Sequence, residues 1–89
     1  MINELKELLN TNVVLQIAST SQCDVSYEGT LTQVNEDTDR FVIKPNFVCV
    51  HINSRPYHAP YNKGPLTLGF DISDISTIDD TDNVIVLEK

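Results

Sequence analysis

The 89-residue chain lacks the features that mark secreted, membrane-spanning and disulfide-rich proteins. It contains two cysteines, Cys23 and Cys49, whose separation matches no disulfide framework, so we expect two reduced thiols. No apolar run approaches the roughly 20 residues that cross a bilayer, and the N-terminus lacks the basic start and apolar stretch of a secretion signal. We therefore expect a soluble cytoplasmic protein without a membrane partner.

Basic residues are also scarce. Six Lys and Arg stand against thirteen Asp and Glu, which gives a formal net charge of -7. This balance argues against a protein that binds nucleic acid or anionic lipid over its whole surface. The charges are nevertheless grouped, because residues 40–70 contain four Lys or Arg and no acid. The grouping indicates electrically distinct faces, or else only chance and the solvation of charged side chains.

Motifs of the common enzyme classes are absent from the sequence. It has no Gly-x-Ser-x-Gly motif, no phosphate-binding loop and no cysteine with a recognisable activating context. Residues 35–39 lack the glycine and glutamate that complete a calcium loop, and they and the acidic residues 79–82 are expected to be polar turns. We therefore expect no enzymatic activity, no cofactor and no small-molecule substrate.

The spacing of apolar residues predicts a short N-terminal helix and a first strand. The helix is indicated by steps of three and four residues between Ile2, Leu5, Leu8 and Leu9. From residue 13 to residue 18 the period falls to two, which is typical of a strand. The polar residues 19–22 are expected to form a turn before a second strand.

The second strand, at residues 25–32, is expected to bend. Gly29 lies inside its alternation, and the step from Leu31 to Val34 is three residues. Such breaks are typical of a bulge or a sharp bend. Residues 53–65 hold three of the four prolines and are expected to be a loop without a regular element. Further strands are predicted at residues 41–44, 47–52, 66–73 and 83–87, with Pro45 and Asn46 separating the first two.

A helix followed by five or more short, bent strands is the pattern of a small closed or partly open β-barrel. We expect one such domain over residues 1–89. Its expected core consists of Val13, Leu15, Ile17, Leu31, Val48, Val50, Leu68, Phe70, Ile75 and Ile78.

The order of these elements and two short motifs resemble the Sm and Sm-like (LSm) RNA-binding proteins. Gly29 and Leu31 match the Gly-x-Leu of the first family motif, and its apolar pair is matched at positions 41 and 43 if one residue is inserted. Residues 70–78 keep the apolar frame of the second motif. The resemblance implies a mainly β fold, with an N-terminal helix before a strongly bent five-stranded Sm-like (SH3-type) barrel and an extra C-terminal strand. It also implies a ring-shaped homo-oligomer.

The resemblance does not extend to the RNA pocket of the family. The second family motif begins with Ile-Arg-Gly, whereas this chain has Phe70, Asp71 and Ile72. In the first motif Asn35 stands where the family usually has Asp, and Thr38 or Asp39 stands where it has Asn. A carboxylate at the position of the family arginine repels phosphate. We therefore expect the uridine pocket of the family to be missing.

Another segment combines cations with aromatic rings. Within residues 55–64, cations that can contact phosphates alternate with rings that can stack on bases, as in proteins that bind single strands. The alternative is a surface loop whose tyrosines pack on the barrel. The candidate nucleic-acid-binding residues are Arg55, Tyr57, His58, Tyr61 and Lys63.

Two functions therefore remain open. One is a ring-forming Sm-like protein that binds single-stranded RNA through residues 55–63. The other is an Sm-fold scaffold or protein-interaction module without RNA binding.

A metal site is not expected. Cys49 and His51 lie on one face of their predicted strand, and Cys23 or His58 could approach them, but the sequence has no Cys-x-x-Cys pair to anchor zinc.

Overall fold

One strongly curved β-sheet and a short helix make up the computed structural model, which describes residues 1–18 and 23–88. The expected turn at residues 19–22 lies outside the described part. The elements are α1 (Ile2–Glu7), β1 (Asn12–Ala18), β2 (Cys23–Asn35), β3 (Arg40–Ile52), β4 (Arg55–Pro60), β5 (Leu68–Asp71), the 3-10 helix η1 (Ile72–Asp74), β6 (Ile75–Asp79) and β7 (Val84–Glu88).

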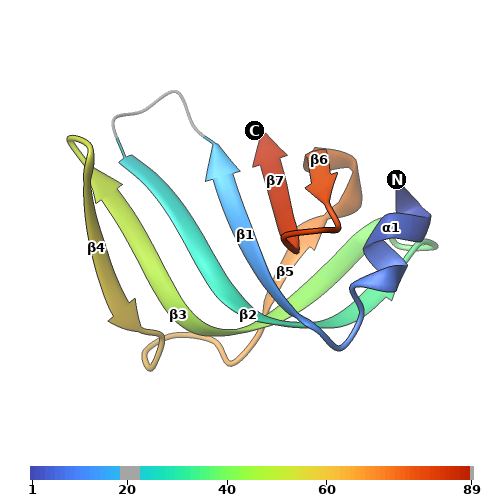
Figure 1. Cartoon of the computed structure of the whole chain (residues 1–89). Helices are drawn as coiled ribbons and strands as arrows, with labels where there is room; N and C mark the ends of the chain where they lie inside the picture. The colour runs from blue at the N-terminus through green and yellow to red at the C-terminus, as the bar shows by residue number, and fades with distance from the viewer. Residues whose placement is uncertain (19–22, 89) are drawn as a thin grey trace.

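The strands lie in the order β4-β3-β2-β1-β7-β6, and β5 pairs with the N-terminal half of β3 (Figure 1). The mainly β fold with a short N-terminal helix is confirmed. The strand count and the connections differ from the expectation, because the described residues form a seven-stranded open sheet. Its β1 and β7 are parallel, since β7 rather than β6 takes the place beside β1.

The predicted bend in β2 is confirmed at Gly29. A Cβ atom on this residue would lie 2.1 Å from the backbone oxygen of Lys44 and 2.6 Å from the Cα of Pro45, so only glycine allows β2 and β3 to approach this closely. The pairing register between β2 and β3 shifts here and again between Leu31 and Gln33. Both strands therefore bend around the core instead of lying flat.

Strand β3 continues through Pro45, whereas the sequence predicted two separate strands. Pro45 pairs with Gly29 and Phe47 pairs with Glu28, which leaves Asn46 as an extra residue. This bulge reverses the side-chain alternation. Odd-numbered residues such as Phe41 face the core before the bulge, and even-numbered residues face the same side after it.

The prediction of an irregular loop at residues 53–65 is wrong for its first half. Asn53 and Ser54 have φ values of 51° and 66° and form a two-residue hairpin turn, after which β4 pairs with the C-terminal half of β3. Pro56 and Pro60 fit this strand because β4 is an edge strand, and their even spacing puts both nitrogens on one side, toward the free edge.

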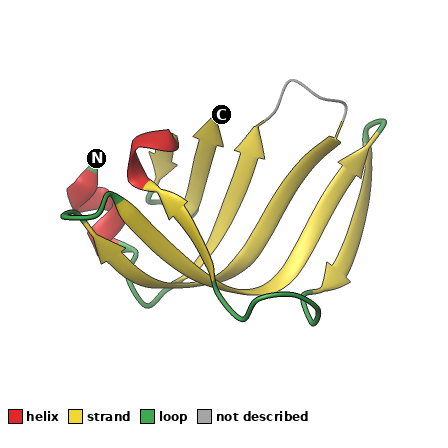
Figure 2. Ribbon diagram, turned by 180° about the vertical axis from the view of Figure 1, so that it is seen from behind, coloured by secondary structure: helices red, strands yellow, loops and turns green. Residues whose placement is uncertain are grey.

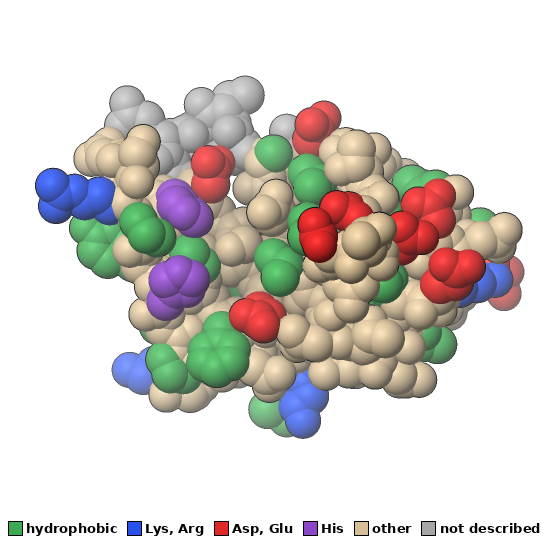
Figure 3. Space-filling model, viewed as in Figure 1, with side chains coloured by type: hydrophobic (Ala, Val, Ile, Leu, Met, Phe, Trp, Pro, Cys, Tyr) green, Lys and Arg blue, Asp and Glu red, His purple; other side chains and the backbone are tan. Residues whose placement is uncertain are grey.

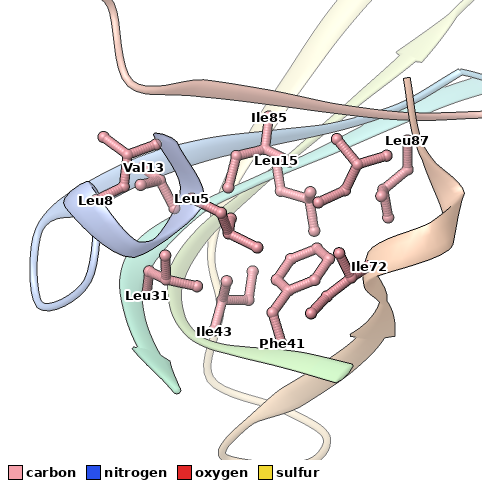
Figure 4. Packing of buried hydrophobic residues seen from close by; sticks show 11 residues of the cluster. Leu5, Leu8, Val13, Leu15, Leu31, Phe41, Ile43, Ile72, Ile85 and Leu87 are labelled. Atoms are coloured by element: carbon pink, nitrogen blue, oxygen red, sulfur yellow. The ribbon is translucent and has the colours of Figure 1, made fainter. Parts of the chain in front are cut away.

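The core lies at one end of the curved sheet, where α1, β5 and η1 cover it (Figures 2 and 4). Of the predicted core, Val13, Leu15, Leu31 and Ile75 are buried. Ile17, Leu68, Phe70 and Ile78 pack against this cluster while partly exposed. Val48 and Val50 were wrongly predicted, because they lie on the uncovered part of the sheet and are only half-buried. The core residues that were not predicted are Leu5, Leu8, Phe41, Ile43, Ile72, Ile85 and Leu87.

The predicted strand at residues 66–73 is shorter than expected. Only Leu68–Asp71 forms a strand, and η1 follows directly. Leu66 is 82% exposed, because it precedes the strand and contacts no part of the core cluster. The chain turns at η1 to enter β6, and this places Ile72 in the core.

Candidate nucleic-acid interface

The predicted nucleic-acid-binding residues divide between the two faces of the sheet. Tyr57 pairs with Val50, and Val50 pairs with Val25, on the side that continues from the core. We call this side of β2, β3 and β4 the inner face. Arg55 lies on it as well, because side chains alternate along a strand. His58 pairs with Cys49 on the opposite side, the outer face, and so is separated from the other candidates.

Tyr61 joins the inner face from the segment after β4. Its backbone N–H donates to the carbonyl of Asn46 (2.8 Å), and its ring packs edge-on against Tyr27, with centroids 6.0 Å apart and an interplanar angle of 82°. Gly64 turns the chain beside the Tyr61 hydroxyl with a φ of 107°, a conformation that favours glycine. All three tyrosines of the chain therefore lie on the inner face.

Tyr27 was missed as a site residue. Burial, together with the nearby hydroxyl of Tyr61, raises the pKa of Tyr27 above its ordinary value. The sequence signal for its position was available, since Tyr27 alternates with Val25 and Leu31 on the second predicted strand. What the sequence could not show is that Tyr61 would return to the same face. Tyr27 is half-buried and supports Tyr61, whereas Tyr57 is 55% exposed.

The inner face is flanked by cations. Arg55 begins β4 and Lys63 follows its other end, and both side chains are exposed. Two other cations are engaged with acids, since Arg40 contacts Asp71 at 2.8 Å and Lys6 forms an ion pair with Glu36. The acids of β2 are Asp24 and Glu28. Their partners in the strand register are His51 and Phe47 on β3, so both acids lie on the outer face.

The acidic side chains visible on the outer face gather mainly toward one end of the molecule (Figure 3). Figure 3 shows the outer face, with most of the visible acidic side chains on the side of α1, β6 and β7 and both histidines at the other end. Arg55 and Lys63 belong to the end that carries β4. Arg40 of the basic block nevertheless contacts Asp71 of the C-terminal acidic block, and Asp24 lies opposite His51, so electrically distinct faces stay a prediction.

The two acidic segments form turns, as predicted. The side-chain oxygen of Asn35 accepts hydrogen bonds from the backbone N–H groups of Asp37 and Thr38, at 3.1 and 3.4 Å. Asp79 does the same for Thr81 and Asp82, at 3.0 and 3.2 Å. Asp71 accepts a hydrogen bond from the Arg40 guanidinium at 2.8 Å.

The outer face holds a shallow cavity of about 240 Å³ whose lining includes Phe47, Cys49, His51 and His58. Cys49 has a free and buried thiol. Its Sγ lies 3.5 Å from Nε2 of His58 and 3.9 Å from Nδ1 of His51. In the described part of the chain, no three such side chains form a ready-made metal site. The side chain of Cys23 lies outside what the structure describes.

The chain was compared with family models, curated proteins and solved structures. No family model, no curated protein and no solved structure matches the chain. The resemblance to the Sm and Sm-like proteins therefore stays a prediction. Among the described residues, no helix is long and apolar enough to span a bilayer.

Proposed function

We propose that this protein is a divergent Sm-like protein that binds single-stranded RNA on its inner face. The observation that carries the proposal is the placement of Tyr27, Tyr57 and Tyr61 on one sheet surface between two exposed cations, Arg55 and Lys63. Proteins that bind single strands stack bases on aromatic rings and contact the phosphates with cations. The pore pocket of the family has no part in this proposal.

The tyrosines have different roles in the proposed site. Tyr57 stacks on a base, because its ring is largely exposed. The ring of Tyr61 packs on that of Tyr27, which holds it in place on the inner face. The side of the Tyr61 ring that points away from Tyr27 is the side proposed to contact RNA. The half-buried Val48 and Val50 lie between these rings and give the bases an apolar floor. His58 is not part of the proposed RNA site, because its side chain lies on the outer face.

Charge placement explains how an acidic protein could bind RNA. The net charge of -7 repels a polyanion at long range, but this repulsion is screened beyond a Debye length of about 8 Å at physiological salt. Because the acids of β2 lie on the outer face, a strand on the inner face would meet Arg55 and Lys63 first. We therefore expect weak binding that depends on few phosphate contacts.

The RNA proposal is tested by measuring fluorescence anisotropy of short U-rich, A-rich and random single strands at several salt concentrations, with EDTA present. Changing Arg55 and Lys63 together to Ala should reduce the salt slope by about 1.4, at about 0.7 per lost phosphate contact on a single strand. Changing Tyr57 to Ala should weaken binding by roughly 5- to 150-fold, the equivalent of about 1–3 kcal/mol, without changing the slope.

The control for these variants is His58→Ala, the next residue on the same strand. It should bind RNA like the natural protein, because its side chain lies on the outer face. Equal losses in His58→Ala and Tyr57→Ala would contradict the proposed surface. RNA binding that is absent, or that has no salt dependence, would reject the RNA function.

We also propose that the protein assembles into a ring. The sheet is open, and β4, β5 and β6 each have one strand edge without a partner among the described strands. The edge of β4 carries Pro56 and Pro60, whose nitrogens cannot donate, whereas β5 and β6 contain no proline. Pairing of β5 in one copy with β6 in the next would join copies head to tail, and such contacts close into a ring when the rotation between successive copies completes a full turn.

Light scattering should therefore give a mass of several subunits at micromolar concentration. A natural protein that is a strict monomer at this concentration would contradict the ring.

One observation favours the second candidate, a protein-interaction module without RNA binding. Phe47 and Leu66 are 50% and 82% exposed, and such large exposed apolar side chains are typical of protein contact sites when they cluster. If the RNA measurements show no binding, this function becomes the better proposal, with Phe47 on the outer face as a candidate contact residue.

A further inference from the structure

The outer face brings together three side chains that bind metals in other proteins. Cys49 and His51 are two residues apart on β3 and therefore point to the same side. His58 is the direct partner of Cys49 on β4. The β3–β4 hairpin thus fixes the backbone positions of one thiol and two imidazoles within one small area. The sequence placed Cys49 and His51 on one face and left the approach of His58 open, and the hairpin provides that approach.

The distances around the thiol fit metal coordination. Tetrahedral zinc has bonds of about 2.3 Å to sulfur and about 2.0–2.1 Å to nitrogen, so its sulfur and nitrogen ligands lie about 3.6 Å apart. The Sγ of Cys49 is 3.5 Å from Nε2 of His58 and 3.9 Å from Nδ1 of His51. Both pairs are therefore already close to the separation that a shared metal ion requires.

The step that remains is a rotation of an imidazole. Without metal the three donor atoms do not surround one point, as the absence of a ready-made site among the described residues shows. His51 and His58 are both exposed, so their rings can turn toward the thiol without displacing core atoms. Cys49, in contrast, is only 9% exposed and provides a fixed anchor.

The surroundings favour a cation. Asp24 lies directly opposite His51 on β2, on the same face, and Glu28 lines the cavity beside Cys49. These carboxylates add negative charge around the three donors and offer oxygen partners for a bound water. One thiolate and two imidazoles are borderline-soft ligands, which suit zinc rather than calcium or magnesium.

We propose that Cys49, His51 and His58 bind one zinc ion, with water as the fourth ligand. On binding, the thiol of Cys49 loses its proton to solvent and coordinates as thiolate, while both imidazoles bind in their neutral form. The ion joins β3 to β4 on the outer face. This site is independent of the proposed RNA surface, which lies on the other side of the same strands.

The test uses the whole reduced chain and Co²⁺, which replaces Zn²⁺ and reports its ligands by absorption. The natural protein should develop the charge-transfer band of a thiolate bound to cobalt, and Zn²⁺ should displace it. Cys49→Ser should abolish the band. His58→Gln and His51→Gln should each weaken Zn²⁺ binding by more than about 100-fold, since loss of a direct ligand exceeds the 10–100-fold typical of outer partners.

The matched control is Cys23→Ser, which removes the other thiol and should keep both the band and the affinity. Because Cys49 is buried, its variant is first compared with the natural protein by thermal unfolding in EDTA. The two histidine variants keep the test decisive if Cys49→Ser unfolds, since both positions are exposed. A missing cobalt band in the natural protein, a band lost in Cys23→Ser, or unchanged affinity in both histidine variants would overturn the site.

Discussion

Replacing Phe41 with alanine is expected to lower the free energy of unfolding by about 3–5 kcal/mol, the range measured for large aromatic side chains in cores. Phe41 is fully buried in the centre of the cluster (Figure 4), and its ring centroid lies 5.7 Å from that of Phe70. Domains of this size have only about 5–15 kcal/mol of total stability. The variant should therefore be partly or largely unfolded at room temperature, as measured by urea denaturation followed by circular dichroism.

Phe47→Ala provides the matched control for this prediction. It removes the same side chain from the same strand, but Phe47 lies beyond the bulge at Asn46, on the outer face, and is half-exposed. The change in unfolding free energy should be below about 1 kcal/mol, as for most surface positions. Equal losses in the two variants would mean that the core does not lie where the structure places it.

Gly29→Ala is expected to destabilise the protein by at least about 3 kcal/mol, at or above the upper end of the usual cost of overpacking. The added Cβ would lie 2.1 Å from the backbone oxygen of Lys44, so β3 itself must move. At a position without such a clash, the same substitution would stabilise by about 0.4–1 kcal/mol through the unfolded chain. The sign of the change in unfolding free energy therefore tests the close approach of β2 and β3 at Gly29.

Gly69→Ala separates a backbone clash from a side-chain clash. The Cβ added there would meet a guanidinium nitrogen of Arg40 at 2.6 Å, and that side chain can swing away. The cost should be at most about 1 kcal/mol, the value of the exposed ion pair between Arg40 and Asp71 that the movement would break. A loss at Gly69 as large as that at Gly29 would contradict this account.

Local patterns in the sequence predicted the elements that local forces determine. The helix at Ile2–Glu7 follows from apolar spacing, and the bend at Gly29 follows from a glycine inside a broken alternation. Strand β4 was missed because its prolines are unfavourable in a strand with two neighbours, and nothing in the sequence says that β4 has only one. Val48 and Val50 were placed in the core because alternation tells which residues share a face, not whether anything covers that face.

The candidate site was predicted only in part, because composition shows which residue types are close in sequence and not which face of a strand they lie on. Arg55, Tyr57, Tyr61 and Lys63 were found from composition, since cations and rings are interleaved there. Assigning His58 to the other face needs the strand and its register. The sequence likewise placed His51 beside Cys49 and left Cys23 and His58 as alternatives. Only the hairpin shows that His58, nine residues away along the chain, lies 3.5 Å from the thiol.

The prolines of β4 also bear on how the protein avoids aggregation. An unprotected edge strand can act as a template on which further chains add, one after another, into fibrils. Along its open side β4 alternates Pro56, His58 and Pro60, so an incoming strand would find two of the three expected backbone donors missing. The exposed hairpin can thus display Tyr57 and Arg55 to a partner while growth of the sheet stops at that edge.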